Sequence, residues 1–260
     1  MESVGIVKKP SVLVTNDDGY QAAGLRALAE ELKDFAQVAI VAPSWERSGA
    51  AQSLTLRQPI VCHKIAENEW AIDGTPADCV IVALHKLLPE PPDLVISGIN
   101  HGANLGENVY YSGTVGAARE AVIHHVHGLA VSLCSKKVNA DFAPTARLAK
   151  QAAELILSEG LPEQVLLNIN VPEGWKSAVR LTRQSKKITR TVLREGEDPR
   201  GSRYFWLSEQ RIDGDMELDA DSDYAAIYAG EASVTPLHLD PTHAESLNHL
   251  SRWASKLGQP

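Results

Sequence analysis

Short apolar runs alternate with segments of helical period through the first two-thirds of the chain. Residues 12–15 have the composition of a buried strand, and Leu25, Leu28 and Leu32 follow at the spacing of an amphipathic helix. Strands separated by helices favour right-handed crossovers, so we predict an α/β fold with a mostly parallel sheet and flanking helices. Further strands are predicted at 38–42, 94–97, 129–133 and 165–171, and further helices at 75–88, 114–125 and 147–157.

The last third of the chain has a different pattern. Segment 176–194 is rich in Lys and Arg, and segment 209–223 is rich in Asp and Glu. These segments fit two solvated strands or a hairpin, or else an arm that pairs opposite charges within or between subunits. A strand at 232–239 and a C-terminal helix follow. We therefore predict an α/β core at residues 1–175 and a β-rich C-terminal extension, or arm, at residues 176–260.

Charge and cysteine content exclude several classes of protein. The formal net charge of −8 gives no general attraction to nucleic acid or anionic lipid, so no stable nucleic-acid complex is expected. A phosphate-bearing ligand must then be held by a local device, such as a metal ion or a cradle of backbone N–H groups. The three cysteines are too few and too widely spaced for a disulfide framework or a Cys-based zinc site. The apolar runs are too short to span a bilayer, and residues 1–10 lack the apolar core of a secretory signal, so we expect a cytoplasmic protein without membrane contact.

Two adjacent carboxylates follow the first predicted strand, at the edge where parallel sheets bind ligands. Asp17 and Asp18 repel each other, so both stay ionised only beside a cation. Hard oxygen ligands of this kind suit Mg²⁺ or Mn²⁺. The alternative is an Asx-type turn that ends at Gly19.

Two more polar loops follow predicted strands. One carries Glu46, Arg47 and Ser48, where the Ser hydroxyl can complete a metal coordination shell and the Arg can pair with phosphate. Alternatively, either residue is an ordinary surface residue of the loop. The other, at 97–106, is rich in Gly and Asn and leads to 112–114, where the start of a predicted helix offers an anion site. Its glycines fit neither a P-loop nor a dinucleotide fingerprint. Together the three loops carry the groups needed for metal-assisted phosphoryl transfer.

The order of these motifs resembles the SurE family of stationary-phase survival proteins, or SurE-type 5′-nucleotidases. The resemblance runs through almost the whole chain. Its motifs are VTNDDG at 14–19, AP at 42–43 with ERS at 46–48, GTPADC at 74–79, SGIN at 97–100 with Gly102 and Asn104, SGTV at 112–115, LNINVP at 167–172, TRQ at 182–184 and VTPL at 234–237.

The resemblance implies a divalent-metal-dependent phosphatase that hydrolyses nucleoside 5′-monophosphates and, in many members, 3′-monophosphates. It also implies a Rossmann-like catalytic core, one Mg²⁺ or Mn²⁺ per subunit, and a C-terminal extension used to assemble a homodimer or homotetramer. The implied metal ligands are Asp17, Asp18, Ser48 and Asn100. The implied phosphate-binding residues are Asn104, Ser112, Gly113 and Thr114. His101 departs from the pattern, because many members are expected to carry Arg or a small polar residue there.

Asp17 and Asp18 are interpreted as the catalytic pair, with Asp18 as the general base that takes a proton from water. One alternative is a haloacid-dehalogenase-type phosphatase with Asp17 as covalent nucleophile, although that family needs Asp-x-Asp rather than adjacent aspartates. Another alternative is a non-catalytic nucleotide or metal sensor that keeps the same fold.

The histidines suggest no zinc site. His124, His125 and His127 are predicted on one helix, at its surface or at an interface, because their spacing is not that of a helical zinc pair. His238 follows the last predicted strand and is a weaker candidate for a position near the active site.

Overall fold

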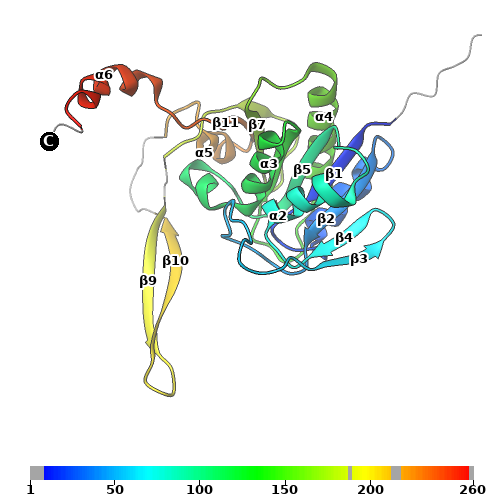
Figure 1. Ribbon diagram of the computed structural model, residues 1–260, viewed down its shortest axis with the longest axis horizontal. Helices are drawn as coiled ribbons and strands as arrows, with labels where there is room; N and C mark the ends of the chain where they lie inside the picture. Colours follow the sequence, from blue (N-terminus) through cyan, green and yellow to red (C-terminus); the bar gives the residue numbers. More distant parts are fainter. Residues whose placement is uncertain (1–8, 187–188, 212–217, 258–260) are drawn as a thin grey trace, which may run out of the picture.

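The predicted apolar strands lie side by side in one sheet (Figure 1). In the computed structural model, which describes residues 9–186, 189–211 and 218–257, this sheet has nine strands in the order β3-β4-β2-β1-β5-β6-β7-β11-β8. Its strands are β1 Ser11–Thr15, β2 Gln37–Pro43, β3 Cys62–Ala66, β4 Glu69–Ile72, β5 Leu94–His101, β6 His127–Cys134, β7 Val165–Pro172, β8 Val179–Leu181 and β11 Ala232–His238.

Parallel pairing dominates the sheet. Strands β4, β2, β1, β5, β6 and β7 are parallel to their neighbours in this series, whereas β3 and β11 run antiparallel to β4 and β7. The predicted α/β fold with a mostly parallel sheet is confirmed. Parallel strands end at the same edge, so the polar loops that follow them are brought together.

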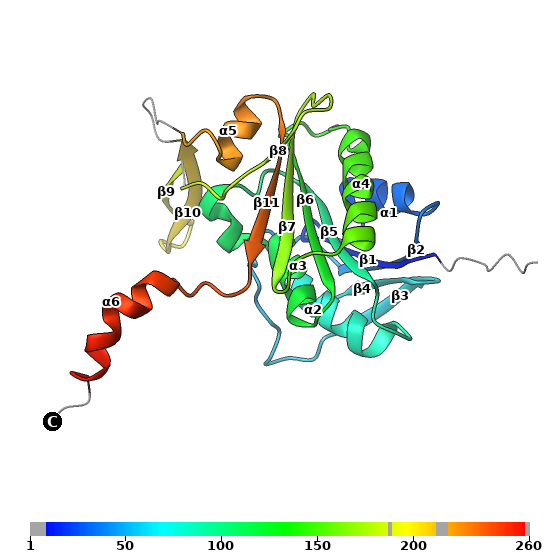
Figure 2. The ribbon, with the colours of Figure 1, turned by 90° about the horizontal axis from the view of Figure 1, so that it is seen from above.

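Helices cover both faces of the sheet. Helices α1 (Ala23–Leu32) and α4 (Ala143–Glu159) lie on one face, where their apolar stripes pack against side chains such as Val12 and Ile96 (Figure 2). Helices α2 (Pro76–Val82) and α3 (Gly113–Ile123) lie on the other face. The remaining helices are the π-helical turn η1 Ala83–Leu87, the 3-10 helix η2 Gly106–Tyr111, α5 Asp223–Tyr228 and α6 Ala244–Ala254.

The predicted start of α2 is confirmed. The Thr75 hydroxyl accepts a hydrogen bond from the Asp78 backbone N–H at 3.1 Å, and the Asp78 carboxylate accepts one from the Thr75 N–H at 2.8 Å. This reciprocal cap satisfies two N–H groups that the first helical turn leaves open. Asp78 also accepts two hydrogen bonds from Thr55, so the cap fixes the end of the loop that follows β2.

Two predictions about local structure are wrong. Strand β5 continues to His101, so half of the segment read as a Gly/Asn-rich loop is strand. His127 lies on β6 rather than on a helix, because α3 ends at Ile123 and His125 takes a positive φ of 61°. His124, His125 and His127 therefore share no helical face.

The last third contributes both to the sheet and to projecting elements. Strands β8 and β11 lie in the main sheet, β11 beside β7. Strands β9 (Thr189–Glu197) and β10 (Arg203–Arg211) form an antiparallel hairpin, and both this hairpin and α6 extend away from the body (Figures 1 and 2). The predicted hairpin exists, but it is formed by residues 189–211, so it includes only the end of the basic segment and the start of the acidic one. Residues 187–188 and 212–217 of these two segments are outside the described residues.

Among the described residues, no helix is long and apolar enough to cross a membrane.

Candidate active site

The loops after β1, β2 and β5 are hydrogen-bonded to one another. The Arg47 N–H donates to the Asp17 carbonyl at 2.7 Å, and the Tyr20 N–H donates to the Pro43 carbonyl at 2.7 Å. From the third loop, the His101 N–H donates to the Asp18 carboxylate at 2.9 Å. The convergence expected from the parallel sheet is therefore present.

A cleft of about 700 Å³ opens where these loops meet. Six of the eight predicted site residues line this cleft. The other two, Gly113 and Thr114, do not line it but are in contact with Asp17. The lining residues are Asp17, Asp18, Glu46, Ser48, Gly49, Asn100, His101, Asn104, Asn108, Tyr111, Ser112, Thr191, Leu207 and Ser208.

Asp17 is a nearly buried carboxylate, with 4% of its surface exposed. Its Oδ1 accepts a hydrogen bond from the Thr114 hydroxyl at 2.6 Å. Burial raises the pKa of Asp17 to about 6, although the Thr114 hydroxyl acts in the opposite direction, and the neighbouring Asp18 raises it further. The fold thus holds a carboxylate where its charge is poorly solvated.

Asp18 is a second carboxylate whose pKa is raised by burial. Burial raises its pKa above the ordinary value, the His101 N–H bond lowers it, and the negative charge of Glu46 raises it. Adjacent carboxylates that both resist ionisation are stabilised by a cation placed between them.

Ser48 and Asn100 offer neutral oxygen atoms at the same cleft. The Ser48 hydroxyl donates to Glu46 Oε1 at 2.8 Å, so its lone pairs remain available to a ligand. Asn100 donates through Nδ2 to the Gly102 carbonyl at 2.9 Å, which leaves Oδ1 as its acceptor. Two carboxylates, a hydroxyl and an amide oxygen form a set of hard donors that fits Mg²⁺ or Mn²⁺. The described residues include no group of three His, Cys, Asp or Glu that could hold a metal ion, so the neutral oxygens are needed.

The first residues of α3 contact Asp17. Ser112 caps the helix by accepting a hydrogen bond from the Val115 N–H at 3.1 Å, and it also lines the cleft. A Cβ atom on Gly113 would lie 2.8 Å from the Asp17 Cβ and 2.9 Å from its Oδ2, so only glycine permits this approach. The Thr114 hydroxyl donates its hydrogen bond to Asp17, so Thr114 orients this carboxylate. The sequence predicted only a phosphate contact for Thr114.

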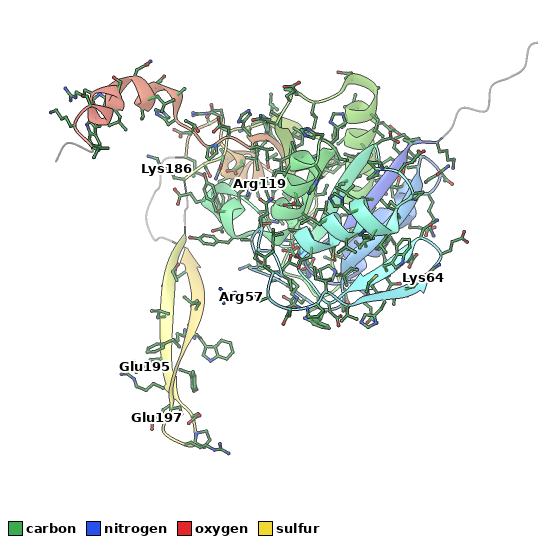
Figure 3. All side chains as sticks on the ribbon, viewed as in Figure 1. Arg57, Lys64, Arg119, Lys186, Glu195 and Glu197 are labelled. Atoms are coloured by element: carbon green, nitrogen blue, oxygen red, sulfur yellow. The ribbon has the colours of Figure 1, made fainter. Side chains whose placement is uncertain are left out.

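The cleft contains no Lys or Arg side chain among the described residues. Arg47, which was considered as a phosphate partner, donates instead to the Gly74 carbonyl at 3.2 Å and lies over the Trp45 ring. Arg57, Arg119 and Lys186, labelled in Figure 3, do not line the cleft either. An anionic ligand therefore meets carboxylates but no Lys or Arg side chain among the described residues.

His101 and His238 are clearly separated by the fold. His101 lines the cleft, and its ring packs edge-on against Phe142 with 5.7 Å between the ring centroids. His238 pairs with Val165, the first residue of β7, and so lies at the opposite edge of the sheet. The weaker prediction that His238 reaches the site is wrong, because β11 runs antiparallel to β7.

Two groups of supporting residues were not predicted as site residues, although Asn168 and Asn170 belong to the LNINVP motif at 167–172. Asn104 is held by the buried side chains of Ser132, Asn168 and Asn170. Two residues further on, the Gly106 N–H donates to the Asp223 carboxylate at 2.7 Å.

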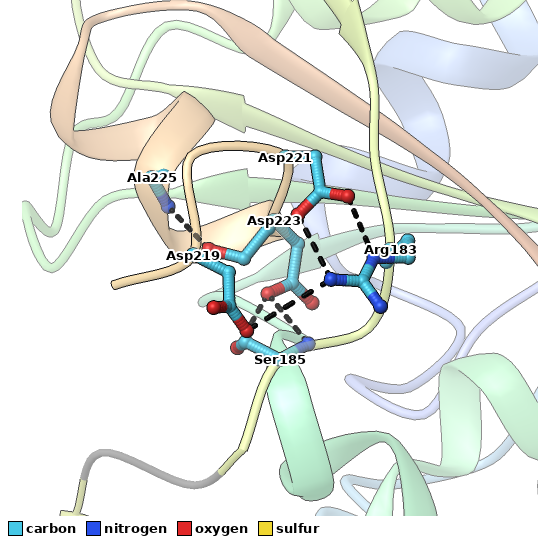
Figure 4. A network of polar contacts seen from close by, with 7 residues as sticks. Arg183, Ser185, Asp219, Asp221, Asp223 and Ala225 are labelled. Carbon is cyan, nitrogen blue, oxygen red and sulfur yellow. Dashed lines mark hydrogen bonds and ion pairs between the residues drawn. The ribbon is translucent and has the colours of Figure 1, made fainter. Parts of the chain in front are cut away.

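Asp223 also joins this loop to the C-terminal part of the chain. Its Oδ1 accepts a hydrogen bond from the Ser185 hydroxyl at 2.7 Å, beside the ion pair of Arg183 with Asp221 (Figure 4). Buried Asp223 therefore links the cleft loop to the segment that leads into the hairpin.

Comparisons with known proteins identify the family of the chain. The sequence model described as "Survival protein SurE" matches residues 12–191. The chain is similar to the 5′-nucleotidase SurE of Pelobacter propionicus, 43% identical over 246 residues that cover 93% of this chain and 98% of that protein. It is also similar to the 5′-nucleotidase SurE of Vibrio parahaemolyticus, 42% identical over 258 residues, or 97% and 98% of the two chains. The crystal structure of the SurE protein from Aquifex aeolicus superposes with a TM-score of 0.83 at 36% identity, over 94% of this chain and 100% of that one.

Proposed function

The chain belongs to the SurE family of 5′-nucleotidases, and on that premise we propose that it hydrolyses nucleoside 5′-monophosphates to nucleosides and phosphate, with one Mg²⁺ or Mn²⁺ bound per subunit. The observation that carries the proposal is the composition of the cleft. Two poorly solvated carboxylates face it, and no Lys or Arg among the described residues lines it. A phosphate dianion can enter only if a cation offsets this negative charge.

The proposed roles of the site residues follow from their contacts. Asp17, Asp18, Ser48 and Asn100 hold the cation. When bound, the cation would offset phosphate charge and make a coordinated water more acidic. The Ser112 hydroxyl, the Asn104 amide and the N–H groups of Gly113 and Thr114 at the start of α3 donate to the phosphoryl oxygens, where the helix dipole also favours negative charge.

Asp18 is the proposed general base. Its Oδ2 accepts from the His101 N–H, so Oδ1 is the atom that can take a proton from the attacking water. The water oxygen bonds to phosphorus, the phosphorus–oxygen ester bond breaks, and the nucleoside leaves as an alcohol after taking up a proton. The burial that raises the pKa of Asp18 makes it a better proton acceptor than an exposed aspartate.

Phosphate release from a panel of nucleoside monophosphates tests the proposal. The panel holds 5′- and 3′-monophosphates, each with Mg²⁺, with Mn²⁺ and with EDTA. We expect turnover of 5′-monophosphates that EDTA abolishes and that Asp18→Asn reduces by about 10³-fold or more. Turnover of 3′-monophosphates at the same site would extend the substrate range.

The same assay separates the alternatives. Absence of turnover with every metal would contradict the proposal and favour a non-catalytic nucleotide or metal sensor. An aspartyl-phosphate trapped on Asp17 would instead favour covalent catalysis of the haloacid-dehalogenase type.

Tyr111 lines the cleft next to Ser112, with 61% of its surface exposed. We propose that the nucleobase stacks on this ring while the phosphate lies at Ser112. Replacing Tyr111 with Ala is then expected to raise KM for adenosine 5′-monophosphate by about tenfold or more, because stacking on an aromatic ring contributes about 1–3 kcal/mol per base. KM for ribose 5-phosphate, which has no base, is expected to stay within about twofold.

Tyr110 provides a matched control. It precedes Tyr111, is 60% exposed, and is absent from the cleft lining. Tyr110→Ala is expected to leave both KM values unchanged. Equal effects of Tyr111→Ala on the two substrates would contradict base stacking.

We also propose that the projecting elements assemble a homodimer or homotetramer. Helix α6 exposes Leu247, Leu250 and Trp253, which recur at helical spacing. Hairpin residues Phe205 and Trp206 are also exposed. Apolar surfaces of this kind on an isolated chain are typical of subunit interfaces.

Light scattering after size exclusion measures this assembly. The wild type is expected at a multiple of the chain mass of 28.1 kDa, and the double substitution Leu250→Asp and Trp253→Asp is expected to lower that multiple. Asn248→Asp, on the same helix, is the control that should not change it. A wild type that elutes as a single chain would contradict the proposal.

A further inference from the structure

Asn104 is held in the cleft by side chains rather than by a strand. Its backbone N–H donates to Asn170 Oδ1 at 2.8 Å. Its carbonyl accepts from Asn168 Nδ2 at 2.9 Å and from Asn170 Nδ2 at 3.0 Å. Its own Nδ2 donates to the Ser132 hydroxyl at 2.9 Å. Four hydrogen bonds from two strands therefore fix one loop residue.

The two asparagines of β7 stand where apolar residues would be expected. Asn168 and Asn170 are two positions apart, so they point to the same face of the sheet, and both are fully buried. Strands buried inside a mostly parallel sheet are normally almost continuous runs of Val, Ile and Leu. Burying an amide is unfavourable unless its hydrogen bonds are made, and the Asn168 Oδ1 has no partner among the described residues. Packing alone does not explain these residues.

The orientation of the Asn170 amide is fixed by its partners. Its oxygen faces a backbone N–H and its nitrogen faces a backbone carbonyl, both of Asn104. If the amide were rotated by 180°, its nitrogen would face the Asn104 N–H, donor against donor, and its oxygen would face the Asn104 carbonyl, acceptor against acceptor. Asn170 thus imitates the paired hydrogen bonds of a neighbouring strand for a residue that lies in a loop.

This arrangement leaves part of the Asn104 side chain for the cleft. Nδ2 carries two hydrogens and uses one for Ser132, so the second, together with Oδ1, can serve a ligand. Asn104 is 8% exposed and lines the cleft with Asn100 and Ser112. The orientation of a group that binds a reacting phosphate affects the rate strongly, because a displacement of about 1 Å can lower it about 10²-fold.

We propose that Asn170, assisted by Asn168 and Ser132, is a positioning residue for catalysis, which holds the Asn104 amide at the phosphoryl group. The proposal rests on the proposed phosphatase function. It concerns kcat and the affinity for phosphate, whereas the cation is held by other residues, of which only Asn100 belongs to the same segment as Asn104.

The test compares Asn170→Leu with wild type. Leu keeps nearly the same volume but removes both hydrogen bonds to Asn104. We expect kcat for a nucleoside 5′-monophosphate to fall about 10²-fold. The dissociation constant of Mn²⁺, measured by electron paramagnetic resonance without substrate, is expected to change less than about threefold. The dissociation constant of inorganic phosphate, measured by calorimetry with Mn²⁺ present, is expected to rise.

Ser233→Ala is the matched control. Ser233 pairs with Asn170 across β11 and β7, is fully buried, and its hydroxyl has no hydrogen-bond partner among the described residues. Removing it changes the same buried layer without touching Asn104. Both kcat and phosphate affinity are expected to equal those of wild type.

Each outcome decides the question. An unchanged kcat in Asn170→Leu would overturn the proposal. A loss of kcat accompanied by an equal loss of Mn²⁺ affinity would also overturn it, because the substitution would then have disturbed the whole site. If Asn170→Leu does not fold, Ser132→Ala decides by the same criteria, with an expected loss of about tenfold for one hydrogen bond. A wild type without turnover would contradict the proposed function, whereas wild-type turnover with an unaffected variant would contradict only this inference.

Discussion

Replacing Asp17 with Asn is expected to abolish metal-dependent turnover and, at the same time, to raise the melting temperature of the metal-free protein. Asn keeps the oxygen that accepts the Thr114 hydroxyl but removes the negative charge that holds a cation. A loss of at least about 10³-fold in kcat is expected, since binding of the cation depends on this charge.

The gain in stability follows from burial. The pKa of Asp17 is raised from 3.8 to about 6 in the folded chain, so ionisation opposes folding. This ionisation lowers the free energy of unfolding by its full amount above about pH 6 and no longer lowers it below the unfolded pKa of 3.8. A difference of about two pKa units corresponds to about 3 kcal/mol at pH 7.5, or a shift of roughly 5 °C or more in Tm for a domain of this size.

Thermal melts of wild type and variant at pH 7.5 and pH 4 measure the effect. In EDTA, the variant is expected to melt higher at pH 7.5, and the difference is expected to disappear at pH 4. With saturating Mn²⁺ at pH 7.5 the order should reverse, because only the wild type gains free energy from binding. A variant that melts below wild type in EDTA at pH 7.5 would show that the Asp17 charge does not destabilise the fold.

The sheet and the location of the cleft could be predicted because both depend on local patterns. Strands β1, β5 and β6 each contain a short apolar run, and α1 carries its apolar residues at helical spacing. Once parallel strands are predicted, their carboxyl ends must share an edge. The convergence of Asp17, Ser48 and Asn100 follows from this rule without knowledge of any contact.

Strands β3 and β4 were missed because they lack such a pattern. All five residues of β3 are exposed, so no alternation of apolar and polar positions marks it. Its partner β4 has only four residues, and the turn between them uses Asn68 with a φ of 57°. A short edge hairpin of this kind is stabilised by pairing with β2, which local sequence does not encode.

The contacts of the supporting residues were missed for a related reason. Thr114 lies 97 residues from Asp17, and Asn170 lies 66 residues from Asn104. A threonine at the start of a helix predicts an anion site, and an asparagine in a strand predicts a solvent-facing position. Only the assembled sheet shows that these side chains donate to other side chains and loops of the protein.

Gly113→Ala is expected to disable the enzyme through a single added methyl group. The new Cβ would lie 2.8 Å from the Asp17 Cβ and 2.9 Å from Oδ2, closer than real side chains approach, so the carboxylate must move. Gly113 is the first residue of α3, where Ala is the better helix former by about 1 kcal/mol. The backbone itself therefore favours the substitution, and any loss must come from the displaced Asp17.

We expect kcat to fall about 10²-fold or more, together with a weaker affinity for Mn²⁺. Gly116→Ala, three residues along α3, is the matched control. Its Cβ would meet the Ala51 carbonyl oxygen at 2.6 Å, a worse conflict that does not involve Asp17. It is expected to lower Tm more than Gly113→Ala while keeping kcat within about threefold at a temperature where it is folded. If both variants lose activity equally, a shift of the whole helix is responsible; if Gly113→Ala alone loses activity and Mn²⁺ affinity, the close approach of α3 to Asp17 is what sets the geometry of the site.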